Sequence, residues 1–265
     1  MALVSAKELL EAGSHFGHRT SRRNPKMDPY IYGKRNKIHI IDVRQTIKGL
    51  VTGYYFLRKI SREGKQVLFV GTKRQAREIV RAQAEKCQSP FVIERWLGGT
   101  LTNLRTIRER VQRLVELEKL LEGPEAEKMS KKMRSTLTRE LRKIRRNLSG
   151  IREMSELPGA MVVVDPRKEY NAVREARKLG VPIVAMLDTD CDPDPIDIPI
   201  PANDDAIRSI EIVISTLARG VMEGRHMTVD KVEAAVPETA AARRSEAAGR
   251  ETTGEAQASR QPAQA

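Results

Sequence analysis

The sequence predicts an α/β fold, with a parallel sheet covered by helices on both faces and an inserted antiparallel helical hairpin. Short, nearly continuous apolar runs rich in β-branched residues alternate with stretches that have apolar residues at helical spacing. This alternation is typical of parallel strands joined by crossover helices. A longer helical pattern, broken once by Gly-Pro, interrupts the alternation at 103–149 and predicts the hairpin.

Each strand of the predicted sheet is an apolar run that ends at a polar or turn residue. These runs are 38–41, 66–70, 91–93, 160–164 and 182–187. The helices are expected at 47–60, 73–87, 168–179 and 207–217. Thr72 can cap the second helix, Gly180 ends the third, and Asn203 or Asp204 can cap the last. Polar turns follow the carboxyl ends of the strands, the edge where such sheets usually bind ligands or partners.

The inserted hairpin has two arms with apolar residues every three or four positions. The turn between them is Gly123-Pro124, and each arm of about 20 residues would be roughly 30 Å long. Thr102 or Asn103 can cap the first arm, after a loop that contains Trp96, the only tryptophan. Trp96 fits either a core anchor or a surface on which a base stacks.

These patterns divide the chain into four parts. They are a basic N-terminal arm at 1–37, a discontinuous α/β domain at 38–102 and 150–225, the hairpin at 103–149, and a tail at 226–265. The tail has almost no aliphatic residues after Val236, so it cannot bury enough apolar surface to order itself. We expect the tail to be disordered.

The charge of the chain is strongly positive and unevenly distributed. Lys and Arg number 48 against 35 Asp and Glu, a net charge of +13, which indicates a polyanionic partner. The N-terminal arm has 8 basic and 3 acidic residues, and the hairpin has 14 and 7. Residues 188–205 hold 7 Asp and no Lys or Arg. This distribution favours RNA on the basic elements, and a basic protein or a cation on the acidic edge.

Membrane and secreted classes have little support in the sequence. No window has the roughly 18 apolar residues of a spanning helix. The first residues carry Lys7, Glu8 and Glu11 before any long apolar run, unlike a secretory signal. Cys87 and Cys191 form no C-x-x-C pair, so we expect a reduced, cytoplasmic protein.

Basic side chains in unbalanced clusters are the candidates for phosphate contact. The run from Arg139 to Arg146 favours such contact over a merely solvated helix face, because its charge is not matched by acidic neighbours. The predicted RNA-binding residues are Arg19, Arg22, Arg23, Lys26, Lys73, Arg74, Arg95, Arg105, Arg139, Arg142, Lys143, Arg145 and Arg146.

The turn Gly71-Thr72-Lys73 follows a strand and opens a predicted helix, where backbone amides attract phosphate. It lacks the G-x-x-x-x-G-K and G-x-G-x-x-G spacings of nucleotide-binding loops. A purely structural turn is the first interpretation, and an RNA phosphate site is the second. The alternative function is a nucleotide-binding α/β enzyme that uses this turn. No G-x-S-x-G or H-E-x-x-H motif supports catalysis, so we expect no enzyme.

The acidic run at 188–194 begins like a calcium-binding loop, but its sixth and twelfth positions are proline instead of Gly and Glu. In one interpretation its carboxylates only cap turns and helices. In the other, a single divalent cation binds at this edge with help from a histidine. The candidate ligands are His18, Asp188, Asp204 and Asp205, with His15 as the other histidine. No other cofactor is expected.

Six segments match the motifs of one known family in the right order. They are EAGSHFGH at 11–18, NPKM at 24–27, IHIID at 38–42, LFVGTK at 68–73, RWLGGTLTN at 95–103 and NDDAIR at 203–208. On these residues the chain resembles, from about residue 3 to 225, the bacterial S-two family, the second protein of the small ribosomal subunit. One departure is Arg23, where that family usually has an aromatic residue before Asn-Pro-Lys. The added charge can replace stacking by a phosphate contact.

The resemblance implies a flavodoxin-like domain with a protruding coiled-coil hairpin, docked between the head and body of the small subunit on its solvent side. It implies that ribosomal RNA is the main partner, beside neighbouring small-subunit proteins. It also implies support for docking of the S-one family protein, which assists messenger RNA recruitment. We therefore expect a structural role in translation in the cytoplasm, with no membrane and no small-molecule substrate.

Overall fold

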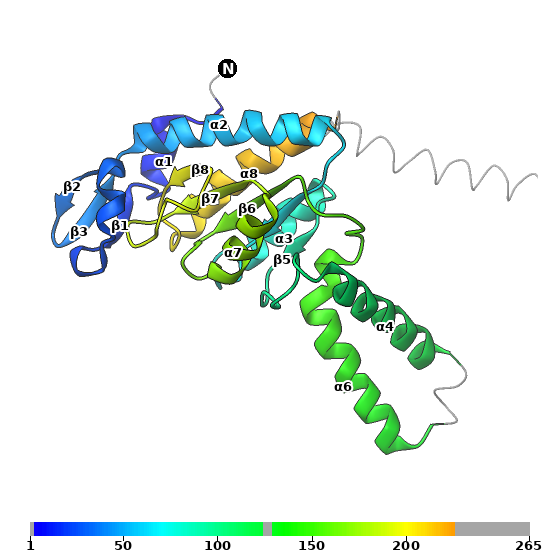
Figure 1. The fold of residues 1–265 in the computed structure, drawn as a ribbon. Coiled ribbons are helices and arrows are strands. Elements are labelled where there is room, and N and C mark those ends of the chain that lie inside the picture. Colours follow the sequence, from blue (N-terminus) through cyan, green and yellow to red (C-terminus); the bar gives the residue numbers. More distant parts are fainter. Residues whose placement is uncertain (1–2, 124–128, 226–265) are drawn as a thin grey trace, which may run out of the picture. The chain divides into compact units, whose positions relative to one another are not determined.

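The computed structural model describes residues 3–123 and 129–225. Its centre is a parallel sheet with the strand order β5-β4-β6-β7-β8 (Figure 1). The strands are β4 (Val67–Val70), β5 (Phe91–Val92), β6 (Ala160–Val164), β7 (Ile183–Leu187) and β8 (Ile198–Pro201). Counted along the chain within this sheet, the order is 2-1-3-4-5, that of the flavodoxin-like doubly wound sheet. The predicted α/β class with a parallel sheet is confirmed.

Helices cover both faces of this sheet. Successive residues of a strand point to opposite sides, so each strand contributes side chains to both helical layers. Val67 and Phe69 belong to one apolar cluster, together with α2 (Val43–Arg62), α3 (Arg77–Lys86) and α8 (Ile207–Gly224). Leu68 and Val70 belong to the other, with α7 (Tyr170–Leu179). Every residue of β4, β6 and β7 is buried, which explains their continuous apolar runs.

The N-terminal part forms a second, antiparallel sheet of order β1-β3-β2. Its elements are α1 (Ala6–Glu11), β1 (Phe16–Arg19), η1 (Thr20–Arg22), η2 (Pro25–Tyr30), β2 (Ile31–Arg35) and β3 (Ile38–Ile41). The prediction of a strand at 38–41 is confirmed, but its place in the parallel sheet is wrong, since β3 pairs with β1 and β2. Asn36 and Lys37, with φ of 49° and 62°, make the two-residue turn that folds β2 onto β3.

The edge strand β8 is absent from the sequence-based prediction because it reads Ile-Pro-Ile-Pro. Proline cannot donate to a neighbouring strand, so it argues against a central strand but is tolerated at an edge. Here β8 pairs only with β7, along the register from Val184↔Ile198 to Leu187↔Pro201.

Three predicted helix caps are wrong. Helix α4 (Leu104–Glu122) has Asn103 at its N-cap position, but neither Thr102 nor Asn103 forms a side-chain cap. Helix α3 begins at Arg77 rather than Lys73, and its N-cap is Ala76 without a side-chain hydrogen bond, so Thr72 does not cap it. Helix α8 begins at Ile207, and Asp204 does not cap it either. Asn203 instead accepts hydrogen bonds from the backbone N–H of Asp205 and Ala206, a local turn that precedes the helix. Gly180 does end α7, in the left-handed conformation expected of it.

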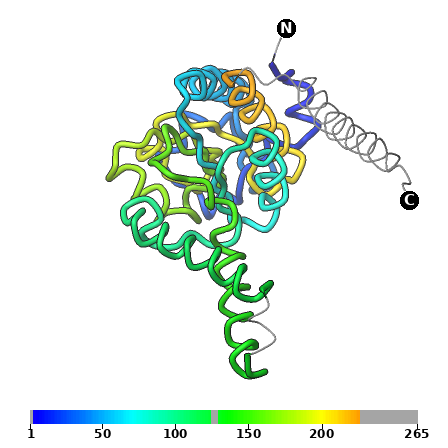
Figure 2. Tube along the Cα trace, turned by 90° about the vertical axis from the view of Figure 1, so that its right-hand side faces the viewer, coloured from blue at the N-terminus to red at the C-terminus, as the bar shows by residue number. Residues whose placement is uncertain are grey.

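The insertion contains α4 (Leu104–Glu122) and α6 (Lys131–Leu148), followed by the 3-10 turn η3 (Ser149–Ile151). Figures 1 and 2 show α4 leading away from the sheet and α6 leading back. Cross-helix ion pairs join Arg113 Nε to Glu140 Oε1 at 3.4 Å and Arg145 Nη2 to Glu118 Oε1 at 3.5 Å. Pro124 of the predicted Gly123-Pro124 turn lies in the range 124–128, outside the described residues, and the coiled-coil hairpin stays a prediction.

The sheet-side ends of the two helices are packed closely onto the domain. Ile107 and Leu148 belong to the apolar cluster on the α7 side of the sheet. A Cβ on Gly150 would lie 2.3 Å from the carbonyl oxygen of Phe91, so this approach to β5 requires a glycine. The predicted tail at 226–265 lies outside the described residues. In the part that the structure describes, no helix is both long and apolar enough to cross a membrane.

Candidate nucleic-acid interface and acidic edge

The carboxyl ends of three parallel strands bring an acidic cluster together around one lysine. Lys73 follows β4, Asp165 follows β6, and Asp204 and Asp205 follow β8. Lys73 Nζ lies 2.8 Å from Asp204 Oδ1, 2.6 Å from Asp205 Oδ1 and 3.9 Å from Asp165 Oδ2. The side chain of Lys73 is only 14% exposed. The structure thus places this predicted RNA-binding residue among carboxylates, which occupy its positive charge.

His18 reaches the same edge from β1. Its backbone N–H lies 3.1 Å from Asp188 Oδ1 and 3.0 Å from Thr189 Oγ1, acceptors at the end of β7. Gly17 permits this approach, since a Cβ there would lie 2.6 Å from Thr189 Cγ2. The ring Nδ1 of His18 is 2.8 Å from Asp188 Oδ2. Nδ1 is buried, and its contact with this carboxylate is close but not well directed as a hydrogen bond.

Three of the four predicted metal ligands come together. One ligand atom each from His18, Asp188 and Asp204 lies within 4.8 Å of the others. Asp205 stands at the rim, 54% exposed, with Oδ2 3.8 Å from His18 Nε2. His15 lies against the ring of Phe16 and outside this trio. One imidazole with two carboxylates is a donor set that Zn²⁺ accepts, with positions left for water or another ligand.

Burial and neighbouring charges perturb the groups of this cluster. The Asp188 carboxylate beside the ring raises the pKa of His18 to about 9. Burial, reinforced by the charges of Asp165 and Asp188, raises the pKa of Asp204 to about 7. Burial opposes the charge of Lys73, but its hydrogen bonds to Asp204 and Asp205 outweigh that effect and raise its pKa.

The turn at Gly71-Thr72-Lys73 is engaged by a carboxylate of the protein itself. The backbone N–H of Thr72 donates to Glu169 Oε1 at 3.0 Å, and the Thr72 hydroxyl donates to the same oxygen. Glu169 is 3% exposed, and burial raises its pKa. A nucleotide phosphate would need the amide that Glu169 uses. The geometry therefore supports the structural interpretation of this turn over the nucleotide-binding one.

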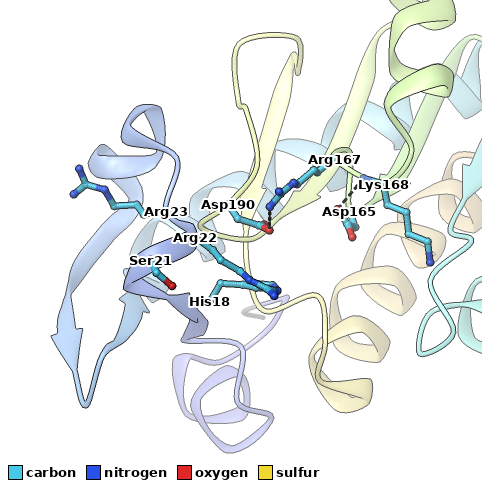
Figure 3. Close-up of a pocket in the computed structure, with 8 residues that line it drawn as sticks. All are labelled: His18, Ser21, Arg22, Arg23, Asp165, Arg167, Lys168 and Asp190. Atoms are coloured by element: carbon cyan, nitrogen blue, oxygen red, sulfur yellow. Dashed lines mark hydrogen bonds and ion pairs between the residues drawn. The ribbon is translucent and has the colours of Figure 1, made fainter.

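Basic side chains from two distant segments line a groove of about 790 Å³ beside this cluster (Figure 3). Arg22 and Arg23 come from the predicted arm, and Arg167 and Lys168 follow β6. Arg167 pairs with Asp190, and Arg23 Nη1 lies 3.0 Å from Asp28 Oδ1. Arg167 and Lys168 are not among the RNA-binding residues predicted from the sequence. Their signal was available, because they directly follow a strand's carboxyl end.

The other predicted RNA-binding residues lie outside this groove. Lys26 pairs with Asp192 at 3.0 Å and with Asp194, within the acidic loop. Arg105 pairs with Glu109 at 3.4 Å. On α6, Arg145 pairs with Glu118, as described above. Across 3–123 and 129–225, the exposed side chains without a carboxylate partner include Arg19, Arg22, Arg74, Arg95, Arg139, Arg142, Lys143 and Arg146.

The loop that leads into α4 is held by Glu175 of α7, a contact that the sequence did not indicate. One carboxylate oxygen accepts from Trp96 Nε1 at 3.0 Å and from the Gly99 N–H at 2.8 Å. The other accepts from the N–H groups of Leu101 and Thr102 at 3.0 and 3.1 Å, and from the Thr102 hydroxyl. Trp96 is 7% exposed and so serves as an anchor, which decides between its two interpretations.

Known proteins match the chain over most of its length. The family model described as ribosomal protein S2 matches residues 9–224. The small ribosomal subunit protein uS2 of Rhodopirellula baltica is 56% identical over 228 residues, which are 86% of this chain and 88% of that protein. The uS2 proteins of Rippkaea orientalis and Synechocystis sp. are each 53% identical, over 87% and 85% of this chain and 86% and 84% of theirs. The chain therefore belongs to the ribosomal protein S2 family and is a protein of the small ribosomal subunit.

Proposed function

We propose that the chain is a structural, non-enzymatic component of cytoplasmic ribosomes that binds small-subunit ribosomal RNA through separate basic surfaces. The observation that carries this proposal is the basic row on α6. Arg139, Arg142, Lys143 and Arg146 are exposed, and they have no carboxylate partner among the described residues. Phosphates are the natural partners of such a row, because each neutralised phosphate releases condensed counterions.

The fold supports this function by holding the row and the groove apart. The proposed coiled-coil hairpin of α4 and α6 carries the row away from the sheet (Figure 1). Its base is anchored by Gly150 against β5 and by Glu175 on the loop before α4. The groove lined by Arg22, Arg23, Arg167 and Lys168 is the second phosphate-binding surface of the proposal. Two surfaces on one compact unit can fix the relative position of two RNA segments.

The acidic loop is the proposed side for protein partners, including the S-one family. Asp192, Asp194 and Asp197 are 47%, 65% and 41% exposed, and each has a basic partner within the chain. Exposed carboxylates repel phosphate and favour a basic protein surface. The chain would then be an adaptor with RNA on its basic elements and protein on its acidic edge.

We also propose that a single divalent cation binds His18, Asp188 and Asp204. The buried Nδ1 of His18 supports this, since it lies 2.8 Å from Asp188 Oδ2 without a well-directed hydrogen bond, an arrangement that suits two ligands of one ion. Lys73 and a protonated His18 carry two positive charges against the four carboxylates of Asp165, Asp188, Asp204 and Asp205. The ion would tie β1 to the end of β7, so its role would be to stabilise the fold.

The test of the RNA-binding proposal is reconstitution of small subunits with charge variants. Replacing Arg142, Lys143, Arg145 and Arg146 with Gln should reduce incorporation of the chain. The matched control replaces Arg58, Lys59, Arg62 and Lys65, which are exposed at the end of α2 and just beyond it. Both variants lose four positive charges, so only a specific contact separates them. Normal incorporation of the α6 variant, or an equal loss in both variants, contradicts the proposal.

A further inference from the structure

Helix α7 presents an exposed aromatic ring beside an apolar groove. Tyr170 is 62% exposed, although it begins a helix whose inner face is buried. The groove beside it has a volume of about 470 Å³, and its walls include Pro166, Val173 and Pro195. Val173 is 4% exposed and belongs to the core, so the floor of the groove is rigid. An aromatic ring held at the edge of a preformed apolar groove suits a flat ligand.

The charges around this groove select the ligand class. Arg167 pairs with Asp190, and Arg177 Nη1 lies 3.5 Å from Asp197 Oδ1. Arg174 lines the groove together with Arg167 and Arg177. It is exposed and has no carboxylate partner within 3–123 and 129–225. The groove therefore offers an apolar stacking surface next to one guanidinium that can donate hydrogen bonds to a phosphate. This combination is typical of sites for unpaired nucleotides in RNA-binding proteins.

The groove also adjoins the basic groove of Figure 3, since Arg167 and Asp190 line both. We propose that α7 holds one unpaired ribonucleotide, with its base stacked on Tyr170 and its phosphate on Arg174. The inference rests on the proposed RNA binding and adds a single-stranded contact to it. Stacking tolerates any base, so the site would recognise an unpaired nucleotide more than a particular sequence.

The experiment measures binding of the full chain to fluorescein-labelled hexauridine and to an RNA duplex without overhangs, by fluorescence anisotropy. We expect Tyr170→Ala to weaken hexauridine binding about tenfold and Tyr170→Phe to change it less than about twofold, because stacking needs the ring. Arg174→Gln should weaken binding and reduce the salt dependence by about one phosphate contact. Duplex binding should not respond to Tyr170→Ala.

The matched control is Tyr55→Ala, because Tyr55 is also exposed, at 55%, but lies on α2. This variant should bind hexauridine like the unmodified chain. Equal binding by Tyr170→Ala and the unmodified chain overturns the inference, as does failure of the unmodified chain to bind hexauridine. Small subunits reconstituted with the Tyr170→Ala variant could instead lack a neighbouring protein while the RNA affinity of the variant is unchanged. That result would identify α7 as a protein-binding surface and would also overturn the inference. In each case the reconstitution with the α6 variant tests the proposed function separately.

Discussion

Glu175 accepts a hydrogen bond from the indole Nε1 of Trp96 at 3.0 Å and thereby joins α7 to the loop that precedes α4. The same carboxylate accepts three backbone N–H groups and a hydroxyl of that loop. Burial opposes the charge of Glu175, but these donors outweigh it and hold its pKa below the usual value. One side chain thus organises the entry to the insertion.

Replacing Glu175 with Ala should lower the free energy of unfolding by about 2–4 kcal/mol, because several donors lose their partner. Glu175→Gln should cost less, since an amide oxygen still accepts. The control is Glu156→Gln, at an exposed position without an ion-pair partner in the described structure. Urea unfolding measures all three variants. A Glu175→Ala variant within about 0.5 kcal/mol of the unmodified chain would show that the loop is held by other contacts.

This relationship also shows where sequence reasoning stops. The strands β4, β6 and β7 were predictable because burial on both faces demands continuous apolar residues. Glu175 was not, because its role depends on a loop more than seventy positions away, and spacing within α7 says nothing of that loop. The Asn36-Lys37 turn was missed because it contains no glycine although both residues have a positive φ. The strand β8 was missed because two of its four residues are proline.

The candidate site was predictable to a similar degree. The acidic edge followed from the rule that polar residues at the ends of parallel strands meet in space. His18 lies outside this rule, because it reaches the edge from β1 of the antiparallel sheet. Asp188 and Asp204 of the trio bear out the proximity that this rule implies. The pairing of Lys73 with that edge could not be read from its position after β4, because Asp204 and Asp205 come from a distant turn.

The protein kept free of divalent cations should lose stability as pH rises. The pKa of His18 is about 9, against an ordinary value of 6.5, so its charge stabilises the folded state. That contribution is fully present below pH 6.5 and is lost as pH rises through about 9. Denaturant unfolding in chelator at pH 6.5 and pH 9.5 measures the difference. His18→Gln should reduce it, and an equal pH dependence in that variant would refute the assignment.

Zn²⁺ should stabilise the chain and change this pH dependence, because metal ligands must be deprotonated to bind. At a free concentration about a hundred times the dissociation constant, the gain is about 2.7 kcal/mol. Thermal unfolding with and without Zn²⁺ gives the shift. Asp188→Asn should abolish it, whereas Asp194→Asn, on the exposed loop, should keep it. Equal shifts in both variants would place the ion elsewhere.

Gly150→Ala should destabilise the chain by about 1–3 kcal/mol, because the new Cβ would lie 2.3 Å from the Phe91 carbonyl oxygen and force η3 away from β5. Gly98→Ala is the control, since nothing lies within 4 Å of a Cβ there. Thermal unfolding of both variants measures the contrast. Equal stability of the two variants would mean that η3 can move away from β5 without lowering the free energy of unfolding.

The central claim, phosphate contact by the basic surfaces, is tested most directly by the salt dependence of affinity for small-subunit ribosomal RNA. The logarithm of the binding constant should fall linearly with the logarithm of salt concentration. Replacing Arg142, Lys143, Arg145 and Arg146 with Gln should reduce that slope by about three to four, one for each lost phosphate contact. A binding constant that is flat between low and moderate salt, or a slope unchanged by these substitutions, would contradict the claim.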